Sequence, residues 1–194
     1  MRPMANYKIL ALFGKSAAGK DTLQKTLVNA PINTNSIVSC TTRPPRENEI
    51  EGEDYHFLSV IDFTKKVLDG SMLEATCFRD WFYGTSIDSL KEDCLNVGVF
   101  NIAGIECLLT DPNIKVYPVQ VEAFDKIRLL RSLQREQNPD CKEICRRFFT
   151  DEEDFNKTKI IPSFVFQNNS KEEFKTELNR LLNWLTEIDA FGQK

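Results

Sequence analysis

The sequence has few of the features that mark broad nucleic-acid binding, metal coordination or membrane insertion. Its 194 residues carry a formal net charge of −4, so it lacks the basic excess of proteins that contact nucleic-acid backbone over a wide surface. The six cysteines form no C-x-x-C pair, and the single histidine lies in no cysteine cluster, so zinc-site spacing is absent. No apolar run approaches the length of a membrane span. We therefore predict no nucleic-acid or membrane partner.

The composition instead predicts one globular domain with inserted lobes. With 41% hydrophobic residues, the chain is long enough to bury a sizeable core. The first six residues run directly into a short apolar strand, which is too brief for the apolar region of a signal peptide. We expect a cytoplasmic protein whose cysteines are free thiols, present as a monomer or homodimer.

Apolar runs alternate with helical patterns along the chain. The residues 7–13 (YKILALF) read as a buried strand and 21–29 as the helix that follows. Later strand-like runs are Val97–Ile102, Ile114–Val121 and Phe164–Gln167, and an amphipathic helix with Trp184 in the core is expected over about 171–188. This rhythm predicts the α/β class, with a central parallel sheet flanked by helices.

Two segments interrupt the rhythm. Residues 36–88 are rich in turn signals and short β-like pieces, which predicts an inserted β-rich lobe. Residues 125–156 are helical and carry charges of both signs, which is typical of a mobile, solvated helical lid. The core is then formed by residues 1–35, 89–124 and 157–194.

The first strand leads into a phosphate-binding loop. Residues 14–20 (GKSAAGK) fit G-x-x-x-x-G-K between a strand and a helix, where backbone amides and the lysine meet phosphate groups. The motif calls for Ser or Thr next, a common Mg²⁺ ligand, but the chain has Asp21, which we place in an outer shell of the metal. The predicted ATP-binding residues are Gly14, Lys15, Ser16, Ala17, Ala18, Gly19, Lys20, Asp21 and Thr22.

Two arginines that flank a proline pair predict a second phosphate site. In Arg43-Pro44-Pro45-Arg46 the prolines favour polyproline II, which has about three residues per turn, so the two guanidinium groups project from the same side. Together they make a bidentate anion clamp. The ordinary alternative is a pair of solvated surface arginines.

Further short motifs follow in order. After the segment that begins at Ser39 come three more: Asp54-Tyr55-His56-Phe57, Met72-Leu73-Glu74-Ala75 and Trp81-Phe82-Tyr83-Gly84-Thr85-Ser86. With the phosphate loop, this series resembles the guanylate kinase family, most strongly over residues 7–86. The resemblance implies a P-loop kinase with a nucleoside-monophosphate lobe and a lid. It also implies a GMP site made by Ser39, Arg43, Arg46, Tyr55, Glu74, Tyr83, Gly84 and Thr85.

The chemistry of guanine agrees with a glutamate at position 74. The guanine edge presents two adjacent donors, N1–H and N2–H, which one carboxylate can accept together, whereas adenine has an acceptor at N1. Ser39 is expected near O6, and Thr85 adds a second hydroxyl. Alternatively, Tyr55 and Tyr83 are core aromatics and Glu74 a surface acid.

The implied reaction moves the γ-phosphoryl group of ATP to GMP or dGMP, with Mg²⁺ as cofactor. The acceptor phosphate has a second pKa near 6, so no catalytic base is required. The groups expected to stabilise the transferring charge are Lys20, Arg43, Arg131, Arg135 and either Arg146 or Arg147. Asn168 matches a family residue near adenine. The alternative for the lid arginines is a set of solvated helix-face charges.

The chain departs from the family on its metal side. Guanylate kinases usually carry D-x-D after the lobe, where this chain has Asn101-Ile102-Ala103-Gly104. One rival function is a related kinase for another acceptor, either another deoxynucleotide or a ribose bisphosphate. A second rival is a catalytically silent binding module, against which the intact Gly14, Gly19 and Lys20 argue.

Overall fold

A five-stranded parallel sheet runs through the part of the chain that the computed structural model describes, residues 6–46, 49–78, 80–135 and 137–190. Its order is β2-β7-β1-β8-β9, and every neighbouring pair is parallel. The strands are β1 (Tyr7–Phe13), β2 (Thr34–Ser36), β7 (Leu95–Val99), β8 (Ile114–Glu122) and β9 (Phe164–Gln167). The expected parallel sheet is therefore confirmed.

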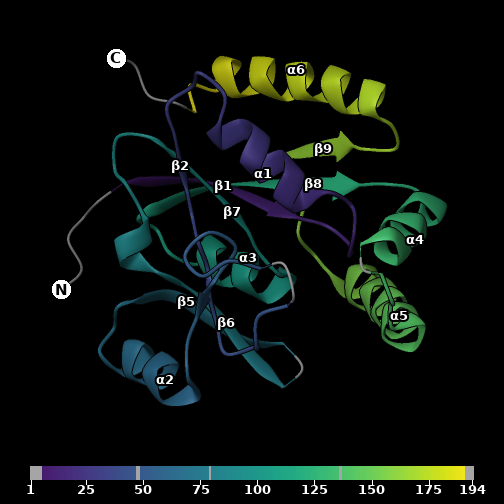
Figure 1. Ribbon diagram of the computed structural model, residues 1–194. Helices are drawn as coiled ribbons and strands as arrows, with labels where there is room; N and C mark the ends of the chain where they lie inside the picture. The colour runs from purple at the N-terminus through teal and green to yellow at the C-terminus, as the bar shows by residue number, and fades with distance from the viewer. Residues whose placement is uncertain (1–5, 47–48, 79, 136, 191–194) are drawn as a thin grey trace.

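Helices cover both faces of this sheet because alternate residues of β1 point to opposite sides. Leu10 and Leu12 pack with α1 (Lys20–Val28) and α6 (Lys171–Glu187). Ile9 and Phe13 pack on the other face with α3 (Ile102–Leu109). Figure 1 shows α1 and α6 together above the sheet, with α3 on its other side. The expected α/β architecture is confirmed.

A smaller sheet lies within residues 36–88. Its order is β4-β3-β6-β5, with β3 parallel to β4 and antiparallel to β6. Phe63 of α2 packs under it against Cys40 and Met72, and the 3-10 turn η1 (Ile87–Ser89) leads back toward β7. The elements are β3 (Cys40–Thr41), β4 (His56–Phe57), α2 (Val60–Leu68), β5 (Met72–Phe78) and β6 (Trp81–Ser86). They lie below the central sheet in Figure 1.

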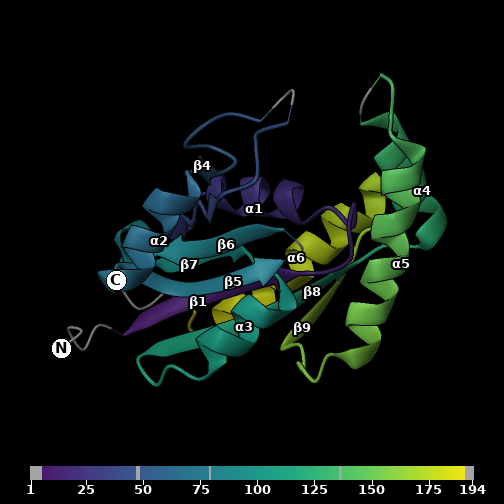
Figure 2. The same cartoon turned by 90° about the horizontal axis from the view of Figure 1, so that it is seen from below.

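Two helices, α4 (Asp125–Gln134) and α5 (Cys141–Lys157), follow β8 and lie side by side (Figure 2). The charged composition of this segment predicts solvated side chains, and that expectation is wrong at two positions. Arg128 and Asp151 are only 2% and 8% exposed. They are buried because they pair with each other and because Arg128 also bonds to the phosphate loop.

The predicted strand over Val97–Ile102 is wrong at its carboxyl end. The strand β7 stops at Val99, and Ile102 begins α3 because the Asn101 side chain caps that helix. Trp184 packs on Tyr117 and Phe164 as expected, and the six cysteines are free thiols. Within the described residues, no helix is long and apolar enough to cross a membrane.

Candidate active site

The phosphate loop joins β1 to α1. Gly19, with φ 104°, is the N-cap of α1, so no cap side chain covers the first amides of the helix. Lys20 Nζ donates to the carbonyls of Gly14 at 2.8 Å and Lys15 at 3.1 Å, which closes the loop around its own side chain. Burial lowers the pKa of Lys20, and the charges of Asp21 and Asp151 oppose that shift.

The second half of the loop is supported from behind by Asn168 and Arg131. Asn168 Nδ2 donates to the Ala18 carbonyl at 2.8 Å. Arg131 donates to the same carbonyl at 3.3 Å and to the Asn168 carbonyl at 2.9 Å. A side chain at Gly19 would collide with the Asn168 amide. Arg131 is thus held against the loop backbone, and not against the space in front of the loop where phosphate would lie.

The two clamp arginines share one carboxylate. Arg43 Nη2 lies 2.9 Å from both oxygens of Glu49, and Arg46 Nη1 lies 3.4 Å from Glu49 Oε1. The Arg46 amide also donates to Glu49, at 2.8 Å. Both guanidinium groups therefore lie on the same side of the segment, as their spacing predicts. The Arg43 guanidinium also stacks over Tyr55, 5.4 Å from the ring centre.

Glu74 is a buried carboxylate on β5, in register with Thr85 of β6. It is 6% exposed, and burial raises its pKa to about 7, although hydrogen bonds from Thr85 act in the opposite direction. The backbone of α3 comes close to it, since a side-chain carbon at Gly104 would lie 3.3 Å from Glu74 Oε2. The surface-acid interpretation of Glu74 is therefore wrong.

Two tyrosines stand beside the clamp. The rings of Tyr55 and Tyr83 meet edge to face with their centres 6.2 Å apart, and Tyr83 also meets Phe78. Burial raises the pKa of Tyr55 to about 12, so its phenol keeps its proton and can donate a hydrogen bond at neutral pH.

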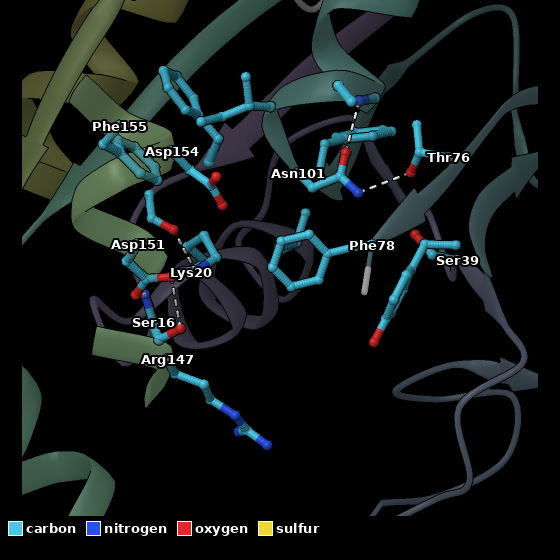
Figure 3. Close-up of a pocket in the computed structure, with 18 of the residues that line it drawn as sticks. Ser16, Lys20, Ser39, Thr76, Phe78, Asn101, Arg147, Asp151, Asp154 and Phe155 are labelled. Atoms are coloured by element: carbon cyan, nitrogen blue, oxygen red, sulfur yellow. Dashed lines mark hydrogen bonds between the residues drawn. The ribbon is translucent and has the colours of Figure 1, made fainter. Parts of the chain in front are cut away.

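One cavity of about 610 Å³ joins the phosphate loop to the small sheet. Figure 3 shows Lys20 and Ser16 on one side of it and Ser39 and Thr76 on the other. The predicted residues that line this cavity are Gly14, Ser16, Ala17, Lys20, Asp21, Ser39, Arg46, Tyr55, Glu74, Tyr83, Gly84 and Arg135. Groups expected at a donor phosphate and at an acceptor nucleotide thus face one space.

The other predicted residues lie around this space. Arg43 and Arg146 line a second cavity of about 380 Å³, which Arg147 and Ser16 also line. Of the two lid alternatives, Arg147 is the one that lines both cavities. Arg146 and Arg147 both bond to the carboxylate of Glu143. The remaining predicted residues are not among those that line either cavity: Lys15, Ala18, Gly19, Thr22, Thr85, Arg131 and Asn168.

Asn101 replaces a family carboxylate with a structural amide. Its oxygen accepts from the Gly104 amide at 2.7 Å and its nitrogen donates to Thr76 Oγ1 at 2.8 Å (Figure 3). In the described ranges, no group of three or more His, Cys, Asp or Glu could hold a metal ion. Mg²⁺ in kinases is commonly held by substrate phosphates and one or two carboxylates. A Mg²⁺ carried by a nucleotide would fit this description, because Asp21, Asp151 and Asp154 line the cavity.

Sequence reasoning missed Glu49, Arg128 and Asp151 as parts of the site. Glu49 lies three residues after Arg46, which places it within reach of the clamp. Asp151 shares one helix face with Phe148, Glu152 and Phe155, at the spacing of a docked amphipathic helix. This spacing indicates that one face of the helix is buried, but the many charged residues of the segment favour a solvated helix instead.

In this protein the first strand of a parallel sheet enters a phosphate loop, and an arginine clamp and a buried carboxylate lie across one cavity from that loop. This is the architecture of a P-loop phosphotransferase. The family model for guanylate kinase matches residues 6–184. The chain therefore belongs to the guanylate kinase family.

Individual relatives agree with this assignment. The guanylate kinase of Maricaulis maris is 44% identical over 77 residues, 40% of this chain and 35% of the relative. That of Helicobacter pylori strain 26695 is 36% identical over 107 residues, 53% and 52% of the two chains. The matches thus span about a third to a half of these relatives. The crystal structure of guanylate kinase from Anaplasma phagocytophilum shares the fold, with a TM-score of 0.63 at 20% identity over 94% of this chain and 86% of that one.

Proposed function

We propose that the protein transfers the γ-phosphoryl group of ATP to GMP or dGMP, giving ADP and the nucleoside diphosphate. The observation that carries the proposal is the shared cavity, which Lys20 lines from the phosphate loop and Glu74 and Arg46 line from residues 36–88. A transferase for two phosphorylated substrates needs both anion sites in one enclosed space.

Guanine is the base that suits the acceptor end. Ionised Glu74 accepts both N1–H and N2–H of guanine, and Ser39 lines the same cavity as a hydroxyl partner for O6. Adenine would place an acceptor against the carboxylate and leave a buried group unpaired, which disfavours it. Arg43 and Arg46, with the protonated phenol of Tyr55, would hold the monophosphate.

Charge stabilisation at the donor end comes from Lys20, Arg135 and Arg147, which all line the cavity. The acceptor oxygen is largely deprotonated at neutral pH, so these groups need only to align two anions and neutralise the transferring phosphoryl group. When bound with ATP, Mg²⁺ supplies further positive charge at the phosphates, and Asp21 is the side chain that would orient its water shell.

Each of the three regions expected from the sequence has its own role in this proposal. We propose that residues 36–88 bind the monophosphate, residues 125–156 act as the lid, and residues 1–35, 89–124 and 157–194 hold ATP. Supporting this division, Glu74 and Arg46 come from the first region, Arg135 and Arg147 from the second and Lys20 from the third.

The test is an ADP-release assay with ATP, Mg²⁺ and a panel of acceptors: GMP, dGMP, AMP, dTMP, CMP, UMP and ribose bisphosphate. We expect turnover of GMP and dGMP at rates at least about a hundredfold above the other nucleotides, because the wrong base leaves Glu74 unpaired. Turnover of the sugar phosphate alone would identify the related sugar kinase instead.

A thermal-shift experiment separates the enzyme from a silent binding module. The enzyme should be stabilised by ATP in a Mg²⁺-dependent manner, whereas a module without a working phosphate loop should not be. Absence of turnover of both guanine nucleotides would reject the proposal, and absence of ATP stabilisation as well would favour the silent binding module.

A further inference from the structure

A carboxylate of this chain already occupies part of the phosphate loop. Asp151 Oδ2 accepts from the backbone amide of Ser16 at 2.6 Å, and Asp151 Oδ1 lies 3.2 Å from the Ser16 hydroxyl. Asp151 belongs to α5, 135 residues further along the chain. Figure 3 shows its side chain reaching from the lid helix to the loop. A loop amide that could meet a phosphate is therefore taken by an internal anion.

The position of this carboxylate is fixed by a buried arginine. Arg128 is 2% exposed and donates to Asp151 at 3.0 Å, to the Ser16 carbonyl at 3.0 Å and to Asp125 at 2.9 Å. Its guanidinium also lies 4.6 Å from the ring centre of Phe148. Ser16 is thus held through its amide by Asp151 and through its carbonyl by Arg128.

Ser16 lies at the acceptor end of the loop. It lines both cavities, including the one formed with Arg43 and Arg46 of the clamp. Ala17 and Ala18, the next two residues of the loop, are bonded through their carbonyls to Arg131 and Asn168. The phosphoryl group that is transferred must face the acceptor. The Ser16 amide is therefore at the end of the loop where the terminal phosphate of ATP belongs.

We propose that Asp151 competes with the terminal phosphate of ATP for the Ser16 amide and so determines the affinity for ATP relative to ADP. The inference rests on the proposed function, because it assumes that ATP binds at this loop. One N–H cannot serve a carboxylate and a phosphate together at full strength, and the two anions repel. ADP lacks the terminal phosphate and leaves the contact in place. Binding of ATP therefore breaks the contact between Asp151 and Ser16, and loss of the γ-phosphoryl group allows that contact to re-form.

The experiment compares ATP and ADP binding, with Mg²⁺ and without acceptor, by titration calorimetry. For the Asp151→Asn variant we expect ATP to bind about tenfold more tightly than to the wild type, because the competing charge is gone. ADP should change by less than about twofold. The matched control is Asp154→Asn, because Asp154 lines the same cavity one helical turn away. It should leave the ratio of the two affinities unchanged.

A second measurement uses the wild-type protein, so it does not depend on how well the variant folds. In hydrogen–deuterium exchange, ATP should increase exchange over residues 148–155 of α5, and ADP should not. Equal effects of the two nucleotides in both experiments would overturn the inference while leaving the proposed function intact. If the wild type and the variant bound neither nucleotide, the inference and the proposed function would both be wrong.

Discussion

The acceptor end and the donor end of the cavity are built in different ways. At the acceptor end, the anion-binding groups are paired within a short stretch of chain, as when Arg43 and Arg46 share Glu49. At the donor end, the loop is paired with a residue from a distant helix, Asp151. In both places a carboxylate of the chain occupies groups suited to phosphate.

The difference shows which half of the site is hydrogen-bonded directly to α4 and α5. Glu74 lies on β5 of the small sheet and the clamp follows β3, and both contact residues of the same segment, 36–88. The phosphate loop, in contrast, is contacted by both helices of the proposed lid, α4 and α5, through Arg128, Arg131 and Asp151. Changes in the lid should therefore affect donor binding before acceptor binding.

The largest effect is expected from Lys20→Met, which removes the cation at the donor end. We expect kcat to fall by about 10³-fold, because a buried charge aimed at the transferring group is lost. The measurement is steady-state turnover of GMP. The control is Lys25→Met on the same helix, whose side chain is 63% exposed, and it should keep kcat within about twofold of the wild type. A loss below tenfold for Lys20→Met would refute its role.

The acceptor end is tested by Glu74→Gln. The amide would turn donors toward the donors of guanine, so we expect kcat/KM for GMP to fall by about 10²-fold, within the range for an unpaired buried group. The Kd for ATP should not change. Glu106→Gln is the control, because Glu106 lines the same cavity from α3. Equal losses for GMP and ATP would mean that Glu74 has only a structural role.

Glu49, which pairs with Arg43 and Arg46, should contribute more to stability than Glu143, which pairs with Arg146 and Arg147. Glu49→Gln should lower the free energy of unfolding by about 1–3 kcal/mol, because the largely buried Arg43 loses its charged partner. Glu143→Gln removes the more exposed partner of Arg146 and Arg147 and should lower it by less than about 1 kcal/mol. Urea unfolding of the two variants measures both values. A larger loss for Glu143→Gln would reverse this ranking.

The smallest effect is a pH dependence of GMP affinity. The pKa of Glu74 is raised to about 7, and only the ionised carboxylate accepts both guanine donors. Affinity should therefore increase by up to about tenfold from pH 6 to pH 8, as the ionised fraction increases. The phosphate of GMP titrates nearby, so the same series is measured on Glu74→Gln. Parallel curves for the two proteins would exclude Glu74 as the source.

The raised pKa of Glu74 also makes the stability of the folded protein depend on pH. Because the pKa of Glu74 is higher in the folded than in the unfolded protein, its contribution is fully present below about pH 4.5, its ordinary pKa. That contribution decreases as the pH rises and is lost once the pH passes about 7. Unfolding of the wild type and of Glu74→Gln across this window should show the difference.

Features set by local pattern were predictable from the sequence. The strand β1 and the phosphate loop combine an apolar run with glycines at fixed spacing, and both lie where they were expected. The end of β7 does not follow from the apolar pattern, because the run Val97–Ile102 continues past Asn101, which caps α3 in the structure. The Asp151 contact joins residues 135 positions apart, and no local periodicity encodes a contact of that kind.

The docked face of α5 also defines a pivot. Phe155 stacks on Phe13 and Asp151 bonds to Ser16, so the carboxyl half of the helix is anchored to the core. With a rise of about 1.5 Å per residue, Asp140 stands about 12 Å from Phe148, whereas Arg147 is its immediate neighbour. Any rotation of α5 about these contacts would displace Asp140 by more than Arg147. Arg147, which lines both cavities, thus lies near the anchored half of the helix and not at its tip.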